Sequence, residues 1–213
     1  MRAHYQADVL LNRHGVLTRG AVIAEGIPGG FAGIYPVLAA FEESGRCQRG
    51  YFVESLGGAQ FALASTVDRL RSYLDDVDSE RPAYRAVLLA AADPANPYGA
   101  AVPWPPARAQ TDGPAARPGR KAGALVVLVD GRPAWFLERG GRSMLTFSDD
   151  PDTHRAAARA LAHGVSTGSL GSLLVERVDG AAILDHTETA AVTVAEALAE
   201  TGFSRTPRGL RLR

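Results

Sequence analysis

The fold of the N-terminal part is decided by residues 16–63, which read VLTRGAVIAEGIPGGFAGIYPVLAAFEESGRCQRGYFVESLGGAQFAL. Upstream of this stretch, a first helix is predicted to end near Leu11, shortly before a glycine that can stop it. Inside the stretch, Thr18 can cap a second helix over 19–25. A turn rich in proline and glycine then leads into a third helix, predicted over 31–44.

The third helix has one apolar face. Ile34, Leu38 and Phe41 recur at spacings of four and three residues, so they share one side of the helix and are predicted to be buried. Two short strands are predicted next, over 47–53 and 60–63, with a glycine-containing turn between them. Three short helices followed by a two-stranded ribbon are typical of a helix-turn-helix with a wing. The sequence therefore predicts an N-terminal winged helix.

Winged helices usually meet nucleic acid through the third helix and the wing, and contact with phosphate needs cations. The predicted third helix contains no lysine or arginine, so the cations available here flank it. The candidate nucleic-acid contacts in this part of the chain are Arg19, Tyr35, Arg46 and Arg49. The alternative is that the winged helix serves as a packing or protein-contact module, because a fold alone does not assign a function.

The composition is that of a globular protein and excludes several classes. Of the 213 residues, 46% are hydrophobic and 22% are charged, which suits one large domain or two small ones. The single cysteine, Cys47, excludes an intrachain disulfide, and no histidine or cysteine pair has metal-ligand spacing, so no metal site is predicted. No apolar run is long enough to span a bilayer and no signal sequence is present, so we expect a cytoplasmic protein without membrane contact.

The net charge is zero, but the charges are distributed unevenly. Residues 107–142 carry seven cations and three anions, and residues 203–213 carry four arginines and no acid. Folding can gather such residues into a basic surface that an anionic polymer recognises. The candidate contacts from these stretches are Arg120, Lys121, Arg139, Arg142, Arg208 and Arg211. The alternative is that these cations form only the solvated rim of a small barrel.

The remainder of the chain has the pattern of a β-rich domain. A polar, proline-containing break divides a winged-helix domain over 1–78 from a second domain over 79–213, which contains a flexible loop over about 107–119. The pair Asp130-Gly131 between two apolar runs predicts a hairpin. Two helices interrupt the strands. We therefore expect an α+β chain, in which the winged helix is followed by an antiparallel β-barrel or curved sheet with inserted helices.

Several strands of this second domain carry specific expectations. The apolar run 86–92 is predicted to be buried, and the stretches 169–178 and 203–213 are each predicted to form one strand. Trp135 and Phe136 must point to opposite faces of their strand, so one is predicted to be core and the other more exposed.

The sequence contains no established catalytic motif. It has no phosphate-binding P-loop, so this chain is not expected to bind ATP, and it has neither a nucleophile elbow nor a zinc-protease motif. The best catalytic candidate is Asp93, at the start of the loop 93–99, because a carboxylate held beside a proline-rigid loop can activate water or stabilise a cation. The alternative is that Asp93 accepts hydrogen bonds from the backbone of its own loop, as aspartates do in turns.

One combination of short stretches is specific as a set. These stretches are RHGVLT at 13–18, GGF at 29–31, YPVL at 35–38, ESGR at 43–46, RGYFV at 49–53, DPANPYG at 93–99, RPGRKAG at 117–123 and TPRGLR at 206–211. Together they resemble the C-terminal region of Lhr, the large helicase-related proteins of bacteria. The resemblance covers nearly the whole chain, although no single stretch is diagnostic.

The resemblance implies a role in a larger protein. Lhr proteins are superfamily 2 ATP-dependent helicases that translocate on single-stranded DNA, and their N-terminal ATPase core is followed by successive winged helices and a terminal β-barrel. By this resemblance the chain is a C-terminal accessory module of a DNA-repair helicase and contributes nucleic-acid binding. Its partners would be DNA, expected to be single-stranded, together with the helicase core and the preceding winged helices. ATP and Mg²⁺ would bind only that core.

The resemblance leaves two other functions open. The winged-helix array of the family looks like that of certain DNA glycosylases, and uracil removal is associated with some members. Uracil-DNA-glycosylase-like base excision is therefore one alternative, with Asp93 as its candidate carboxylate, because the arginine-rich last residues offer no acid. The other alternative is an oligomerisation or docking module without DNA contact, which includes a homo-oligomer.

Overall fold

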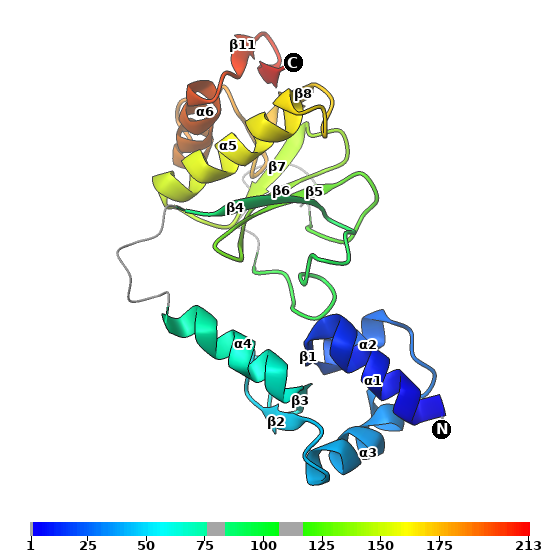
Figure 1. The fold of residues 1–213 in the computed structure, drawn as a ribbon. Helices are drawn as coiled ribbons and strands as arrows, with labels where there is room; N and C mark the ends of the chain where they lie inside the picture. Colours follow the sequence, from blue (N-terminus) through cyan, green and yellow to red (C-terminus); the bar gives the residue numbers. More distant parts are fainter. Residues whose placement is uncertain (1, 76–83, 107–116) are drawn as a thin grey trace. The chain divides into compact units, whose positions relative to one another are not determined.

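A computed structural model describes residues 2–75, 84–106 and 117–213 (Figure 1). The chain divides into two compact units, one made of residues 1–82 with 97–103 and the other of residues 83–96 with 104–213. The predicted domain boundary after residue 78 and most of the predicted 107–119 loop lie outside the described residues. Among the described residues, no helix is both long and apolar enough to cross a membrane.

The first unit is a winged helix, as the sequence predicts. Its three strands form a sheet in the order β1-β3-β2, with both neighbouring pairs antiparallel. The elements are α1 (Arg2–His14), β1 (Val16–Leu17), α2 (Arg19–Ala24), α3 (Gly30–Glu43), β2 (Gln48–Gly50), β3 (Gln60–Ala62) and α4 (Ala64–Asp75). Ile34, Leu38 and Phe41 are buried on one face of α3, as their spacing predicts.

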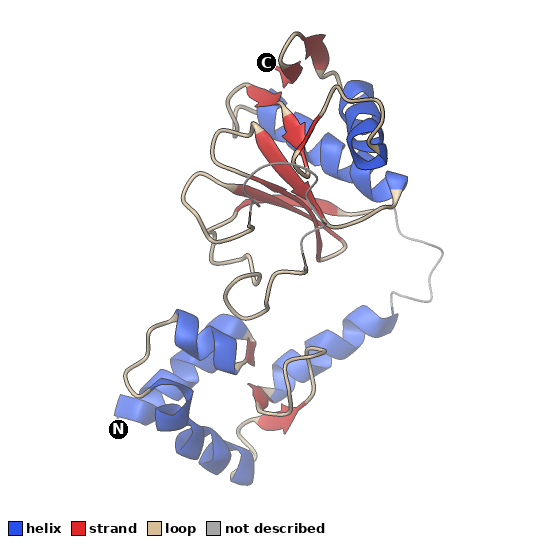
Figure 2. Cartoon of the chain, turned by 180° about the vertical axis from the view of Figure 1, so that it is seen from behind, coloured by secondary structure: helices blue, strands red, loops and turns tan. Residues whose placement is uncertain are grey.

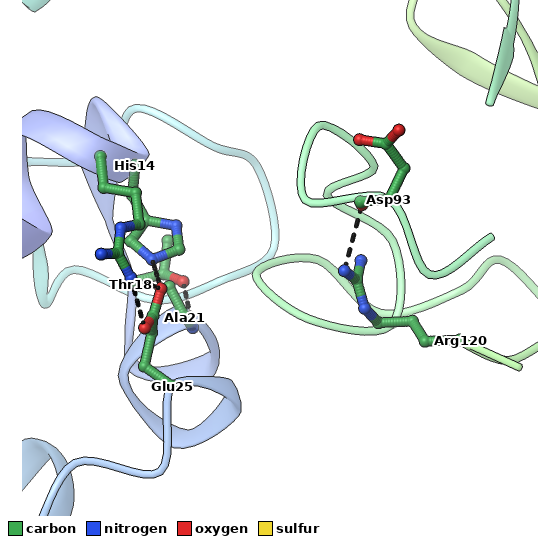
Figure 3. A network of polar contacts seen from close by, with 7 residues as sticks. His14, Thr18, Ala21, Glu25, Asp93 and Arg120 are labelled. Carbon is green, nitrogen blue, oxygen red and sulfur yellow. Dashed lines mark hydrogen bonds and ion pairs between the residues drawn. The ribbon is translucent and has the colours of Figure 1, made fainter. Parts of the chain in front are cut away.

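The cap of α2 also anchors a distant segment of the same unit. The Thr18 hydroxyl accepts a hydrogen bond from the backbone N–H of Ala21 at 3.1 Å, so the predicted N-cap is confirmed (Figure 3). The same hydroxyl donates to the carbonyl of Ala101 at 3.4 Å. A Cβ on Gly20 would lie 2.7 Å from the carbonyl oxygen of Ala100, so only glycine allows this close approach. Residues 97–103 are thereby held against the start of α2.

The first helix is longer than predicted, and its end is tied to α2. It continues to His14 because Gly15, at a φ of 68°, provides the left-handed stop and donates its N–H to the carbonyl of Leu11. Arg13 donates to both carboxylate oxygens of Glu25 at 2.7 and 2.9 Å, and the His14 Nε2 lies 3.0 Å from the same group (Figure 3). The hydrogen bond from Arg13 holds the pKa of Glu25 below its ordinary value, and His14 adds to this effect.

The second unit contains two sheets and two helices. Its six-stranded sheet has the order β10-β9-β7-β6-β5-β4, and its three-stranded sheet has the order β11-β12-β8. The elements are β4 (Ala86–Ala90), β5 (Leu125–Val129), β6 (Arg132–Leu137), β7 (Ser143–Thr146), α5 (Pro151–Ser166), β8 (Leu173–Val175), β9 (Arg177–Val178), β10 (Ala181–Ala182), α6 (Thr189–Glu200), β11 (Ser204–Thr206) and β12 (Gly209–Leu212). The predicted hairpin at Asp130-Gly131 joins β5 to β6, with positive φ at both residues.

The predicted antiparallel barrel is wrong, because the sheets of the described residues do not close. β4 and β10 form the free edges of the larger sheet, and β7 pairs with β9 in parallel. The predicted strand 169–178 is divided between the two sheets, since the carbonyl of Arg142 accepts from the N–H groups of Glu176 and Arg177 and draws β9 to β7. The predicted strand 203–213 is a hairpin that turns between β11 and β12. The fold remains α+β.

Both faces of the larger sheet are covered. Trp135 and Met144 belong to the core beneath α5 and α6, which lie over one face (Figures 1 and 2). Phe136 belongs to a second buried cluster on the opposite face, where Trp104 and Phe147 pack against it. The prediction that either Trp135 or Phe136 is exposed is therefore wrong: both have no exposed surface. The stretch 86–92 is also less buried than predicted, because β4 is an edge strand.

The hairpin of the small sheet depends on a glycine. Gly209 has a φ of 154°, and a Cβ at this position would overlap the carbonyl oxygen of Val175. We expect Gly209→Ala to lower the free energy of unfolding by about 2 kcal/mol or more, because steric overlap adds to backbone strain. Urea denaturation measures this decrease. Gly168→Ala is the matched control, because its φ is also positive but no atom lies within 4 Å of the added Cβ; an equal decrease in both variants would contradict the steric explanation.

The carboxylate of Glu25 makes the first unit sensitive to acid. A carboxylate whose pKa is lowered in the folded state contributes stability above its unfolded pKa, and this contribution is lost as the pH falls through the folded value. We expect Glu25→Gln to lower the free energy of unfolding by roughly 1 kcal/mol at pH 7. At a pH below the folded pKa the decrease should be much smaller, because the wild-type carboxylate is then protonated and therefore uncharged as well. Thermal unfolding at both conditions measures the difference. An equal cost at both conditions would show that the charge does not matter.

Candidate nucleic-acid interface

A hollow of about 550 Å³ lies between α2 and the first half of α3. It is lined by Arg19, Ile23, Gly29, Gly30, Phe31, Ala32, Tyr35 and Pro36. Arg19 is exposed, and its side chain forms no ion pair or hydrogen bond within the described part of the chain. The rings of Phe31 and Tyr35 are 5.8 Å apart and tilted against each other. The hollow therefore combines an unpaired cation with aromatic surface on the helix-turn-helix.

Tyr35 connects this hollow to the wing. Its hydroxyl accepts a hydrogen bond from Arg49 at 2.9 Å, and its ring meets Phe61 edge-on at 5.9 Å. The Nε of Arg49 lies 3.2 Å from a carboxylate oxygen of Glu42, so part of its charge is balanced locally. The fold thus brings together three of the four predicted contacts of this unit, Arg19, Tyr35 and Arg49, from α2, α3 and β2.

Arg46, the fourth predicted contact, is used inside the winged helix. Its Nη2 lies 2.8 Å from the carboxylate of Asp8, and its guanidinium stands 4.1 Å above the ring of Phe41. These contacts join α1 to the end of α3. Cys47, the next residue, is buried, and this burial raises the pKa of its thiol, as expected for a structural cysteine.

The wing carries an aromatic residue that sequence reasoning placed in a strand and did not select. Tyr51 directly follows β2 and has 83% of its surface exposed. The wing behind it is fixed by the Gln60 side chain, which is 1% exposed and bonds the backbone of Phe52, Val53 and Gly57. The sequence signal that could have found Tyr51 is an aromatic residue that directly follows a glycine in the predicted wing, two residues after an arginine.

In the second unit, Arg120 points into its own domain. It donates to the carbonyl oxygens of Ala92, Asp93 and Asn96 at 3.1, 3.1 and 2.6 Å. The carboxylate of Asp93 points away from this guanidinium and accepts the N–H of Ala95 at 2.8 Å (Figure 3). Both predicted site residues therefore hold the 92–96 turn, which is the alternative that the sequence allowed for Asp93.

Three other predicted cations lie around the turn between β6 and β7. Lys121 donates to the carbonyl of Arg117 and lies 3.9 Å from Glu138. The exposed side chains of Arg139 and Arg142 have no hydrogen bond or ion pair within the described residues. The stem of Arg139 passes the backbone of Gly123, where a Cβ would lie 3.1 Å from its Cγ. Lys121, Arg139 and Arg142 thus form a cationic rim at one end of the larger sheet.

The C-terminal arginines occupy a different sheet from this rim. Arg208 pairs with Glu176 at 3.0 Å, at the turn between β11 and β12. Arg211 lies on β12, the middle strand of the small sheet, opposite Leu174. The six predicted cations of this unit therefore do not share one surface. Arg120 holds a turn of its own domain, three cations form the cationic rim, and Arg208 and Arg211 belong to the small sheet.

A polar pocket that sequence reasoning missed lies in the second unit. Its volume is about 520 Å³, and it is lined by Asp149, His154, Val178, Asp179, Ala181, Thr187, Glu188, Thr189, Ala190, Ala191 and Thr193. His154 is 1% exposed, and its Nδ1 accepts the indole N–H of Trp135 at 2.8 Å. His154 is therefore a buried part of the pocket wall. No sequence motif marks the pocket, because its residues come from three separate stretches, 149–154, 178–181 and 187–193.

Asp179 is a buried residue that lines this polar pocket. It is 7% exposed, and its carboxylate accepts both the N–H and the hydroxyl of Thr146, at 2.9 and 2.5 Å. Glu188 is the N-cap of α6, but its side chain makes no capping hydrogen bond. Among the described residues, no group of three potential ligands could hold a metal ion. The pocket thus offers hydrogen-bonding carboxylates and hydroxyls to a polar organic group.

Comparison with known proteins shows which larger proteins this chain matches. A model of the winged-helix domain of the large helicase-related protein, the fourth such domain, matches residues 1–82. The chain is 68% identical over 214 residues to the Lhr helicase/probable uracil glycosylase of Mycolicibacterium smegmatis, covering 100% of this chain and 14% of that protein. It is 39% identical over 209 residues to the Lhr helicase/uracil glycosylase of Escherichia coli, covering 96% of this chain and 12% of that protein. The chain therefore corresponds to a region of Lhr (large helicase-related) proteins that makes up 12–14% of their length and includes the fourth winged-helix domain.

Proposed function

We propose that this chain is a nucleic-acid-binding accessory region of an Lhr-type DNA-repair helicase. The observation that carries the proposal is the cluster on the helix-turn-helix. There Arg19, which has no ion pair or hydrogen bond among the described side chains, shares a hollow with Tyr35, which Arg49 holds from β2. A guanidinium without a carboxylate partner gives up no existing ion pair when it meets a phosphate. Aromatic surface beside it suits unpaired bases, so single-stranded DNA is the proposed partner.

The cationic rim of the second unit supports the same function. Arg139 and Arg142 are exposed and unpaired within the described residues, so their charges are available to a phosphate backbone. Arg120, Arg46 and Arg208 are not proposed as main contacts, because each is already engaged by carbonyl oxygens or a carboxylate. ATP and Mg²⁺ are proposed to bind only the helicase core. That core and the other domains of the parent protein are the proposed protein partners of this region.

Base excision is a second candidate function, and the polar pocket is the observation that favours it. A volume of about 520 Å³ falls in the range of small-molecule sites. Its carboxylates could accept hydrogen bonds from a base or activate water. In such a reaction water adds to C1′ of the deoxyribose, the bond from C1′ to the base nitrogen breaks, and the base leaves with a proton. Both relatives carry uracil glycosylase in their names.

Removal of the unpaired cations should weaken binding in a salt-dependent manner. For Arg19→Ala and for Arg139→Ala/Arg142→Ala, we expect weaker binding to a labelled single-stranded oligonucleotide. The slope of log K against log salt should fall by about 0.7 for each phosphate that the variant no longer neutralises. Fluorescence anisotropy across a salt series measures both quantities. Unfolding curves should not change, because these side chains make no ion pair or hydrogen bond within the described residues.

Arg155→Ala provides the charge-matched control for this series. Arg155 lies on α5, where it pairs with Asp152 and Glu200, so its removal should leave the salt slope unchanged. If the control and the test variants behave alike, or if the wild-type chain does not bind, the proposed function is wrong.

The pocket and the Asp93 loop give opposite expectations for base excision. If the pocket performs the reaction, Asp149→Asn and Glu188→Gln should slow abasic-site formation from uracil-containing DNA by about 10²–10⁴-fold. Asp93→Asn should retain the rate, since an asparagine oxygen can still accept the Ala95 N–H. Loss of activity only in the Asp93 variant would move the reaction to the loop, and absence of product from the wild-type chain would remove this candidate.

A further inference from the structure

The wing presents an aromatic side chain in a defined position. Tyr51 is 83% exposed, yet its ring lies across the wing backbone at Gly58. A Cβ on Gly58 would stand 2.9 Å from both Cζ and Oη of this side chain. The ring fits here because residue 58 has no side chain. The ring therefore rests on the wing with most of its surface open.

The wing that supports Tyr51 is fixed by a buried amide. The Nε2 of Gln60 donates to the carbonyls of Val53 and Gly57 at 2.9 and 2.7 Å. Its Oε1 accepts the N–H groups of Phe52 and Val53 at 3.2 and 2.8 Å. This single side chain uses both of its donors and accepts twice, and it is 1% exposed. The loop between β2 and β3 is thereby organised before any ligand binds, which lowers the entropic cost of binding.

The chemistry around Tyr51 favours a nucleic acid as its ligand. Arg49 precedes Tyr51 by two residues, a spacing that places both on one side of an extended chain. Arg49 also donates to Tyr35, so this arginine links the start of the wing to the cation and aromatic cluster of the helix-turn-helix. A cation beside an open aromatic face can take a phosphate and the base attached to it. A stacked duplex keeps its base faces covered, whereas a single strand exposes them.

We propose that Tyr51 is a stacking residue for an unpaired base, so that the wing is a single-strand platform. The proposal rests on the proposed nucleic-acid function, which it deepens by assigning a base contact in addition to the phosphate contacts. The ring stacks on one base of the bound strand. Arg49 meets the backbone through Nη2, because its Nη1 donates to Tyr35 and its Nε faces Glu42, whereas Nη2 has no bond among the described residues. Because any base has an aromatic face, the platform accepts single strands without strong sequence preference.

The test compares Tyr51→Ala with Tyr51→Phe and with Tyr73→Ala in the full chain. Tyr73 is 57% exposed on α4 and serves as the matched surface control. For a labelled single-stranded oligonucleotide, we expect Tyr51→Ala to weaken binding about 5- to 100-fold. Tyr51→Phe and Tyr73→Ala should bind as the wild type does. The salt slope should not change in any of the three, because no charge is removed.

Gly58→Ala supplies an independent variant that leaves Tyr51 in place. Its added Cβ should displace the ring and weaken binding to the single strand, while the unfolding transition stays cooperative. Normal binding by Tyr51→Ala, with a normal salt slope, would overturn the stacking role and leave the proposed function intact. Equal weakening for single strands and a blunt duplex would also overturn it, since stacking requires open bases. If the wild-type chain does not bind the oligonucleotide at all, the proposed function itself is wrong, and the proposal that Tyr51 stacks on a base is then wrong as well.

Discussion

Burial of one face of α3 is the constraint on which the winged helix and its candidate interface depend. Full burial of Ile34, Leu38 and Phe41 contributes roughly 5–9 kcal/mol before the entropy of ordering is subtracted. A single hydrogen bond such as the one that Tyr35 accepts contributes about 1 kcal/mol. The core therefore sets the rotation of α3, and the hydrogen bond from Arg49 only refines where the tyrosine points. The position of the candidate interface is therefore set by the buried face of α3.

Local pairing decides which arginines remain available. Arginine dominates the cations of this chain, but the structure engages several of them internally: Arg120 with three carbonyls, Arg46 with Asp8, and Arg208 with Glu176. The unpaired ones, such as Arg19 and Arg139, are those with no carboxylate in reach within the described residues. Charge counts along the sequence thus overestimate the binding surface, because they cannot distinguish a structural guanidinium from a free one.

The features predictable from sequence are those encoded within a few residues. The Thr18 cap, the Asp130-Gly131 hairpin and the apolar face of α3 each depend on local spacing, and each is confirmed. The prediction of a closed barrel is wrong because strand pairing is non-local: the carbonyl of Arg142 binds the backbone of residues 176–177 and divides one apparent strand between two sheets. The polar pocket was missed for the same reason, since no local pattern links His154 to Asp179. Tyr51 was visible in the sequence, but its exposure was not.

The chain crosses between the two units more than once. Residues 97–103 belong to the first unit, although the residues on both sides of them belong to the second. Because Thr18 and Gly20 are fitted to this returning segment, a version of the winged helix truncated before it would expose the start of α2 and leave the Thr18 hydroxyl without its acceptor. A winged helix that is expressed on its own therefore needs residues 97–103 joined to it, because a single cut in the chain leaves this segment with the second unit.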